Sequence, residues 1–177
     1  MLGTRVIMMG MDGFPGGLTG QPNAEMICAA NHQLPVYWLM AFAIDDIELF
    51  EVNTSESEVL THEEGDEYPV LLTDQEDAVT RLNKRKEKLQ PYLTTEELLL
   101  LEKWIGFLEQ QDFPVLAIDT YELWINLNNP DQLHKEISNL LQQFAELETK
   151  PESVLNTLKT SGVWMENNTI NLSGYGW

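Results

Sequence analysis

Cys28 and His32 are the residues best suited to nucleophilic chemistry, because they stand four positions apart in "CAANH". On a helix this spacing places both side chains on one face, where the imidazole can accept the thiol proton. A reactive thiolate also needs a nearby cation or helix N-terminus, and the surroundings of Cys28 are acidic. We therefore predict a buried structural cysteine and no catalytic residue. The alternative is a small enzyme or ligand-binding domain, whose site joins these two residues to distant ones such as Asp119 and Glu122.

A second group of side chains with chemical potential forms the segment "HEEGDE". Its one histidine and four carboxylates are His62, Glu63, Glu64, Asp66 and Glu67. Calcium binds such oxygens when they alternate around a tight turn, and this order is missing here. One histidine is too few for a zinc site. We therefore predict a solvated acidic loop that holds no metal, and a chain without a cofactor.

The glycines of "GFPGGLTGQ", residues 13–21, raise the question of a phosphate-binding loop. Such a loop continues into a lysine and a serine or threonine, and a dinucleotide-binding fingerprint needs its own glycine spacing before a helix. Neither pattern is present. This segment is therefore interpreted as a turn.

The distribution of charge is more informative than any of these motifs. The chain has 29 acidic and 10 basic residues, which gives a formal net charge of −19. Residues 1–80 hold 15 acids and one base, and no lysine or arginine occurs between Arg5 and Arg81. Such a potential repels nucleic acid and anionic membranes and attracts basic proteins. Solubility is the competing explanation, since excess acid keeps proteins in solution.

These properties predict an acidic protein-binding module with a basic protein partner, and with neither nucleic acid nor membrane as a partner. In size, acidity and lack of a possible disulfide, the chain resembles the general class of immunity proteins and nuclease inhibitors. The resemblance implies an inhibitor that neutralises a toxin or nuclease, and it leaves open a version whose carboxylates copy the spacing of DNA phosphates. Carboxylates would steer association, and aromatic residues would supply contact energy. The predicted partner-binding residues are Asp45, Asp46, Glu48, Glu51, Glu56, Glu58, Glu63, Glu64, Asp66 and Glu67.

Half of the positive charge lies in one short cluster, formed by Arg81, Lys84, Arg85, Lys86 and Lys88. On a body of net charge −19, such a cluster would meet nucleic acid against long-range repulsion. Contacts within the molecule, with the acidic segment that precedes the cluster, are the interpretation we favour.

Short apolar or β-branched runs predict strands at residues 5–11, 24–30, 47–52, 68–73 and 113–119, with a single helical turn as the alternative for 24–30. Pro69 should keep its strand near a sheet edge or a strand end. Pro35 is suited to begin a short buried helix near residues 35–43, although a continuous strand over 35–52 is the alternative.

Capping signals and apolar spacing predict helices in the rest of the chain. Thr73 with Glu76 and Thr94 with Glu97 form capping boxes, which open helices to about Leu89 and Gln110. A short helix over residues 120–127, with an extended strand as its alternative, should precede longer helices that begin near Asn129 and Pro151. The C-terminal "LSGYGW" either folds against the body or presents an anchor to a partner.

The order of these elements predicts one α+β domain over residues 1–177. Its small antiparallel or mixed sheet, built from N-terminal and returning strands, packs with about four to five helices mostly in the C-terminal half. It includes an acidic loop at about 53–67, a helical hairpin at about 74–110 and a C-terminal hairpin at about 163–172. The sequence shows no signal-peptide or membrane-spanning segment, so we expect a cytoplasmic protein, whose oligomeric state stays open.

Overall fold

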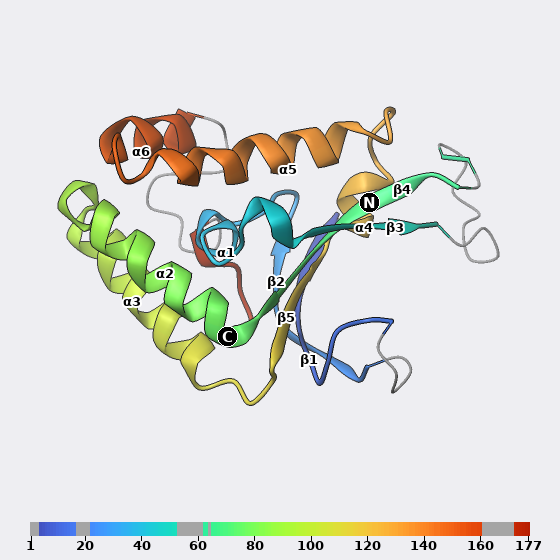
Figure 1. Cartoon of the computed structure of the whole chain (residues 1–177), viewed down its shortest axis with the longest axis horizontal. Helices are drawn as coiled ribbons and strands as arrows, with labels where there is room; N and C mark the ends of the chain where they lie inside the picture. Colours follow the sequence, from blue (N-terminus) through green and yellow to red (C-terminus); the bar gives the residue numbers. More distant parts are fainter. Residues whose placement is uncertain (1–3, 17–21, 53–61, 64, 161–171) are drawn as a thin grey trace.

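The computed structural model describes residues 4–16, 22–52, 62–63, 65–160 and 172–177, and a five-stranded antiparallel sheet lies at its centre. The strands lie side by side in the order β2-β1-β5-β4-β3 (Figure 1). Their bounds are Arg5–Met11 (β1), Ala24–Asn31 (β2), Ile47–Glu51 (β3), Glu67–Asp74 (β4) and Val115–Asp119 (β5). The predicted α+β fold with its small antiparallel sheet is therefore confirmed.

The described residues include six α-helices, one or two more than the sequence predicts. Their bounds are Val36–Leu39 (α1), Gln75–Leu89 (α2), Thr95–Glu109 (α3), Tyr121–Trp124 (α4), Gln132–Gln143 (α5) and Pro151–Thr160 (α6). Short 3-10 turns lie at Ile44–Asp46 (η1), Gln90–Tyr92 (η2) and Phe144–Glu146 (η3). Four of the six helices begin after residue 90, which agrees with the predicted concentration in the C-terminal half. No helix in the described residues has the length and apolar character needed to cross a membrane.

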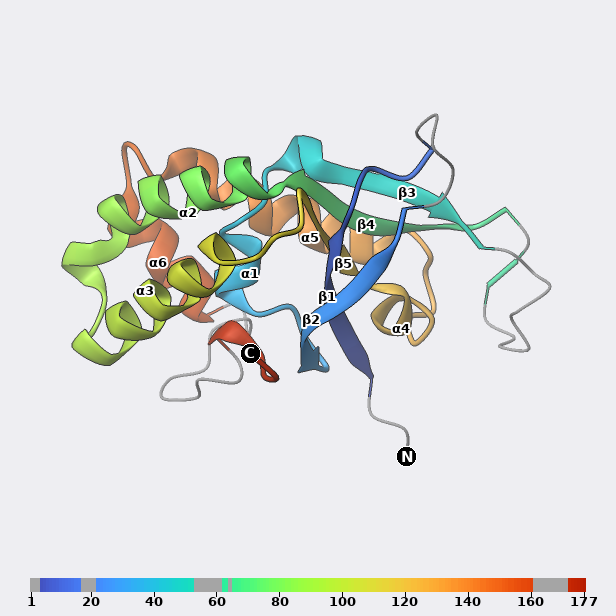
Figure 2. The ribbon, with the colours of Figure 1, turned by 90° about the horizontal axis from the view of Figure 1, so that it is seen from below.

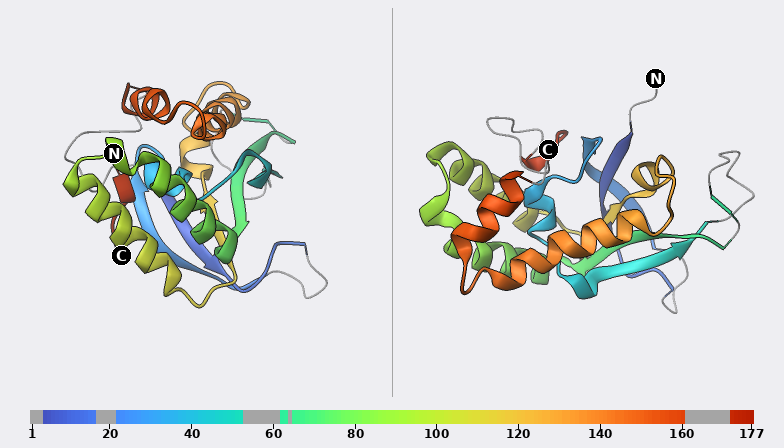
Figure 3. Two further views of the ribbon diagram at one scale, coloured as in Figure 1. Left: turned by 60° about the vertical axis from the view of Figure 1, so that its left-hand side comes forward. Right: turned by 90° about the horizontal axis from the view of Figure 1, so that it is seen from above.

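The helices pack on one face of the sheet. Figure 3 shows α5 running across this face, beside α1 and α6. Figure 2 looks at the opposite face, which no helix of the described chain crosses. That second face carries its own small apolar cluster, formed by Met11, Val70, Leu72, Val115 and Ala117.

The centre of the main core is the buried segment over residues 34–42, which contains α1. Trp38 stacks on Trp104 of α3, with ring centroids 6.2 Å apart. The Trp104 indole N–H donates to the backbone carbonyl of Tyr37 at 3.2 Å, and the Tyr37 hydroxyl donates to the carbonyl of Glu97 at 2.8 Å. Because these polar atoms have partners, the aromatic rings are buried without a desolvation penalty. The predicted short buried helix is confirmed, and the alternative of a continuous strand over 35–52 is wrong.

The two predicted capping boxes have different outcomes. Thr94 and Glu97 form theirs reciprocally, since each side chain accepts a hydrogen bond from the other residue's backbone N–H. The box at Thr73 is wrong, because Thr73 is a buried residue of β4 and pairs with Leu116 of β5. Asp74 is the N-cap of α2 instead. Because β4 runs directly into α2, Thr73 still belongs to the strand and cannot serve as the N-cap of the helix.

Pro69 occupies an interior strand, because β4 lies between β5 and β3. Pairing with β5 begins one residue later, at Val70, so Pro69 needs no N–H toward that neighbour. The sequence predicts that Pro69 lies either near a sheet edge or near a strand end, and the structure shows the second of these. The short helix predicted after Asp119 is confirmed by α4, where the Asp119 carboxylate accepts from the N–H of Tyr121 at 2.9 Å.

The described end of the chain folds against the body. Tyr175 and Ala29 exchange two backbone hydrogen bonds of 2.8 and 2.9 Å, which adds a one-residue bridge to the outer edge of β2. Trp177 packs edge-on against Trp104, with centroids 5.1 Å apart. The hairpin predicted at about 163–172 lies outside the described residues, apart from its last position, Leu172.

Candidate protein-binding surface

Strands β3 and β4 run side by side at the end of the molecule opposite α2 and α3 (Figure 1), and five described residues of the predicted partner-binding set lie in or next to these strands. Antiparallel pairing brings η1 and β3 next to the residues that lead into β4. We call the seven described members of the predicted set the acidic edge; they are Asp45, Asp46, Glu48, Glu51, Glu63, Asp66 and Glu67. The other three, Glu56, Glu58 and Glu64, lie outside the described residues.

Two carboxylates of the acidic edge stand directly opposite each other. Glu51 of β3 pairs with Glu67 of β4, and both are exposed. Like charges at opposed positions of an antiparallel pair repel across about 5 Å, and this repulsion destabilises the pair. β3 is also the outermost strand on this side of the sheet, so its second edge faces away from β4. The hairpin therefore combines an open strand edge with concentrated negative charge.

Lysines neutralise carboxylates elsewhere in the molecule but not at these positions. The ion pairs of α2, α3 and the C-terminal helices join Lys84 and Lys88 to Glu148, Lys86 to Glu102, Lys150 to Glu146 and Lys159 to Glu97. Within the described residues, no lysine or arginine lies within ion-pair distance of Glu48, Glu51 or Glu67. Basic side chains of the described residues therefore leave the charges of Glu48, Glu51 and Glu67 uncompensated.

Two large apolar side chains are exposed among these acids. Ile44 of η1 is 47% exposed and Leu49 of β3 is 41% exposed. Leu49 lies between Glu48 and Phe50 on the edge strand, opposite Pro69. Apolar side chains surrounded by charge are the usual composition of a protein-binding patch, in which burial supplies affinity and the charged rim sets the rate.

A small groove of about 170 Å³ joins the acidic edge to the start of α5. Its lining combines apolar and acidic residues, namely Leu49, Gly65, Asp66, Glu67, Pro130, Asp131 and His134. The sequence placed Asp66 and Glu67 in the set but assigned His134 no role and left out Asp131. Only the tertiary contact of the β3–β4 hairpin with the α5 end of the chain brings them together.

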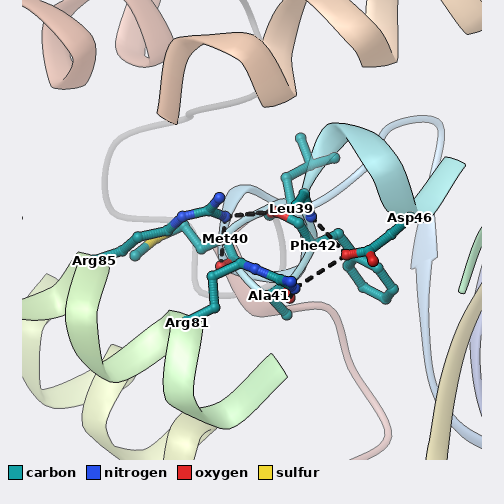
Figure 4. Close-up of polar contacts among 8 residues, drawn as sticks. Leu39, Met40, Ala41, Phe42, Asp46, Arg81 and Arg85 are labelled. Carbon is teal, nitrogen blue, oxygen red and sulfur yellow. Dashed lines mark hydrogen bonds and ion pairs between the residues drawn. The ribbon is translucent and has the colours of Figure 1, made fainter. Parts of the chain in front are cut away.

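Asp46 differs from the other members because it already has partners inside the molecule (Figure 4). One of its carboxylate oxygens accepts from the N–H of Ala43 at 2.7 Å and from Arg81 of α2 at 3.0 Å. Burial raises the pKa of Asp46 above its ordinary value, and the Ala43 N–H and the Arg81 charge oppose that shift. This contact supports the interpretation that the basic cluster interacts within the molecule.

His62, the one histidine of the predicted metal alternative, is packed on an aromatic ring. Its imidazole stacks on Trp124 of α4, with centroids 3.9 Å apart, and its Nε2 lies 3.1 Å from the Trp124 carbonyl oxygen. Its Nδ1 lies 3.8 Å from the carboxylate of Asp66, which also accepts from the backbone N–H of Glu63. In the described part of the chain, no three histidine, cysteine or acidic side chains lie close enough to hold a metal ion.

The four residues of the alternative enzymatic site have separate surroundings. Cys28 is buried in β2 opposite Met8, and burial raises the pKa of its thiol, which disfavours the nucleophilic thiolate. His32 is exposed, with a left-handed backbone (φ 65°). The Glu122 carboxylate accepts from the backbone N–H of Arg5 at 2.7 Å. A site assembled from these residues stays a prediction.

The chain matches none of the protein-family models, no curated protein sequence and no solved structure.

Proposed function

We propose that this chain is an acidic protein-binding module that captures a basic protein partner, as an inhibitor or immunity-type protein that neutralises a toxin or nuclease. The observation that carries the proposal is the opposed pair Glu51 and Glu67 on the edge hairpin. The pair destabilises the free hairpin, and a lysine or arginine of a partner placed between the two carboxylates would relieve their repulsion. Binding therefore gains energy that the isolated protein lacks.

Exposed apolar groups supply the other part of the binding energy. A partner that covers Ile44 and Leu49 removes both side chains from water. Full burial of an exposed aliphatic side chain contributes about 1.5–3 kcal/mol, and since these two are less than half exposed, each would contribute roughly half of that or less. The groove beside Leu49 offers a cationic side chain the carboxylates of Glu67 and Asp131 along with an apolar wall. Arginine and lysine fit such a site because their stems are apolar and their heads are charged.

The position of β3 suggests how the partner lies on the surface. Its outer edge presents backbone N–H and carbonyl groups to which an extended segment can add as a further strand. A partner strand that matches β3 would place basic residues opposite Glu48 and Glu51 and an apolar residue opposite Leu49.

The test compares three immobilised full-length proteins in capture from a lysate of the native host, followed by identification of the retained proteins. The edge variant carries Glu48→Lys, Glu51→Lys and Glu67→Lys. The control variant carries Glu25→Lys, Glu109→Lys and Asp112→Lys, which are exposed residues away from the acidic edge. Both variants change the net charge by the same amount, so they separate local from global electrostatics.

We expect a basic protein to be retained by the wild type and the control variant and released by the edge variant. Purified, that protein should bind the wild type directly with a micromolar or lower Kd. Retention of the same proteins by all three chains would contradict the proposal, as would an acidic protein as the sole specific partner.

A further inference from the structure

A pocket lined by positive charge lies beside α2, away from the β3–β4 pairing that carries Glu48, Glu51 and Glu67. It has a volume of about 240 Å³ and lies between α2 and the η3 turn that follows α5. Four cations of α2 line it, together with two apolar residues, one alanine and one carboxylate: Arg81, Lys84, Arg85, Lys88, Phe144, Leu147, Ala145 and Glu148. We call it the α2 pocket.

The four cations form one stripe on the helix. Their spacing of three, four and seven residues places Arg81, Lys84, Arg85 and Lys88 on a single face over two turns. Like charges at three and four residues' separation destabilise a helix by about 0.2–0.5 kcal/mol per pair. Lys86 of the same helix instead pairs with Glu102 of α3 at 3.9 Å. The stripe therefore concentrates like-charge repulsion at one place in a protein whose net charge is −19.

Carboxylates compensate only part of this charge. Arg81 pairs with Asp46, and Lys84 and Lys88 share Glu148, at 3.8 and 2.8 Å. Within the described residues, no carboxylate lies within ion-pair distance of Arg85. Four cations therefore face two carboxylates, and the pocket keeps an excess of positive charge.

Arg85 is held in place by neutral groups. Its Nη1 donates to the carbonyl oxygens of Met40 at 2.8 Å and Phe42 at 2.7 Å (Figure 4). Its guanidinium carbon lies 4.4 Å from the centroid of the Phe144 ring. Burial, and then the charge of Arg81, lower the pKa of Arg85 to about 9. An anion brought into the pocket would stabilise its charged form.

Glu148 indicates where an anion sits. Its carboxylate already binds Lys84 and Lys88 at the mouth of the α2 pocket, and the bond from Lys88 lowers the pKa of Glu148. An incoming anion that carried more charge and more acceptor oxygens than one carboxylate would displace it. A phosphate group meets this description, with up to two charges and three or more oxygens.

We propose that the α2 pocket binds a phosphate group, carried either by free inorganic phosphate or by a small organic phosphate monoester. The pocket volume lies below the roughly 300–1,000 Å³ typical of drug-sized ligands, which limits the organic part to a few atoms. The proposal does not depend on the acidic edge, so either can fail without the other.

The test is calorimetric titration of the full-length protein with inorganic phosphate, and separately with glycerol 3-phosphate, at low ionic strength. Wild type should bind either ligand saturably with one site. Lys88→Gln should weaken binding about tenfold, because it removes one charge-assisted hydrogen bond. Glu148→Gln should strengthen binding severalfold, because it removes the competing carboxylate. Lys86→Gln is the matched control, with the same loss of charge on the same helix outside the pocket.

Tighter binding of glycerol 3-phosphate would assign the pocket to an organic monoester, and equal binding would assign it to free phosphate. Two results would overturn the proposal: heat changes that do not saturate, or an equal loss of affinity in Lys86→Gln and Lys88→Gln. Unchanged affinity in Glu148→Gln would also overturn it, since that carboxylate occupies the proposed position of the phosphate.

Discussion

Two arginine side chains of α2 donate hydrogen bonds to backbone carbonyl groups of the buried segment around α1. Arg81 donates to the carbonyl oxygen of Ala41 at 2.6 Å, and Arg85 donates to those of Met40 and Phe42. The last carbonyl groups of a helix have no partner within it, and each buried acceptor left unpaired costs about 1–3 kcal/mol. Two arginines of the basic cluster therefore have structural roles. The same two arginines also line the α2 pocket and contribute to its positive charge.

Tyr68 of β4 illustrates how burial makes a residue sensitive to alkali. Its ring contacts Tyr121 and Trp124 of α4, with centroids 5.2 and 5.7 Å away. Burial, with the charge of Asp119 as a second cause, raises the pKa of Tyr68 to about 12. The unfolded chain therefore loses this proton at lower pH than the folded protein.

We predict that the free energy of unfolding falls as the pH rises above about 10 and that Tyr68→Phe makes this fall shallower. Since the folded pKa is the higher one, the stabilisation is complete below the unfolded pKa and is lost as the pH rises through the folded one. Urea unfolding of the wild type and of Tyr68→Phe at about pH 8 and about pH 11 measures how far the free energy of unfolding falls with pH in each protein. Cys28 and Tyr37, whose pKa values are also raised by burial, keep part of the effect in the variant. Identical slopes in the two proteins would refute this assignment.

At the scale of elements, the C-terminal segment completes the outer side of β2. Gly174 is buried beneath Trp38 and has a left-handed backbone (φ 73°). A Cβ added there would lie 2.5 Å from the Trp38 ring and 2.6 Å from the carbonyl oxygen of Ala29. The indole N–H of Trp38 donates to the carbonyl of Ser173 at 2.8 Å, which holds the segment in this position. The close approach therefore requires glycine.

Gly174→Ala should reduce the free energy of unfolding by about 2–4 kcal/mol, through overpacking together with backbone strain. Gly176→Ala is the matched control, because its backbone is also left-handed (φ 89°) and an added Cβ meets nothing within 4 Å. Strain alone should lower its stability by about 1–2 kcal/mol. Denaturant unfolding of both variants measures the difference. Equal losses would mean that the segment does not press on Trp38 in solution.

At the scale of the whole molecule, charge of opposite sign gathers at two ends. Glu48, Glu51 and Glu67 lie on β3 and β4, whereas the basic stripe of α2 belongs to the helical end (Figure 1). Asp46 is the acidic-edge residue that reaches α2, through its ion pair with Arg81. The net charge of −19 repels anions at long range, so any phosphate reaches the α2 pocket through local contacts. In the proposed function, a basic protein would be attracted at long range and would then meet the acidic edge.

Association with the basic partner isolated by the capture experiment should slow sharply as salt increases. Between about 50 and 500 mM the Debye length falls from about 14 to 4 Å, and steering by exposed carboxylates is lost. The on-rate should fall at least about tenfold, and the off-rate should change less. Stopped-flow or surface plasmon resonance measures both. The edge variant should show a shallower salt dependence than the control variant, and an on-rate indifferent to salt would exclude steering.

The local sequence predicted most of the elements. The strands, the helical hairpin and the capping box of Thr94 and Glu97 depend on residues within a few positions of one another, where propensity and side-chain hydrogen bonds act directly. The acids of residues 45–67 were also recognised from their order in the chain. The failed box at Thr73 shows the limit of this approach, because pairing with Leu116 took precedence over a local signal.

Only the tertiary structure decided which distant residues meet. The last strand in the described residues, β5, lies at the centre of the sheet, Glu51 faces Glu67, and Asp131 lines a groove with Glu67. The α2 pocket likewise needs Glu148, sixty residues after Lys88. Such contacts depend on the packing energy of the whole chain, which no single segment contains. Sequence alone therefore determined the elements and the charges, while the fold determined the two proposed binding surfaces.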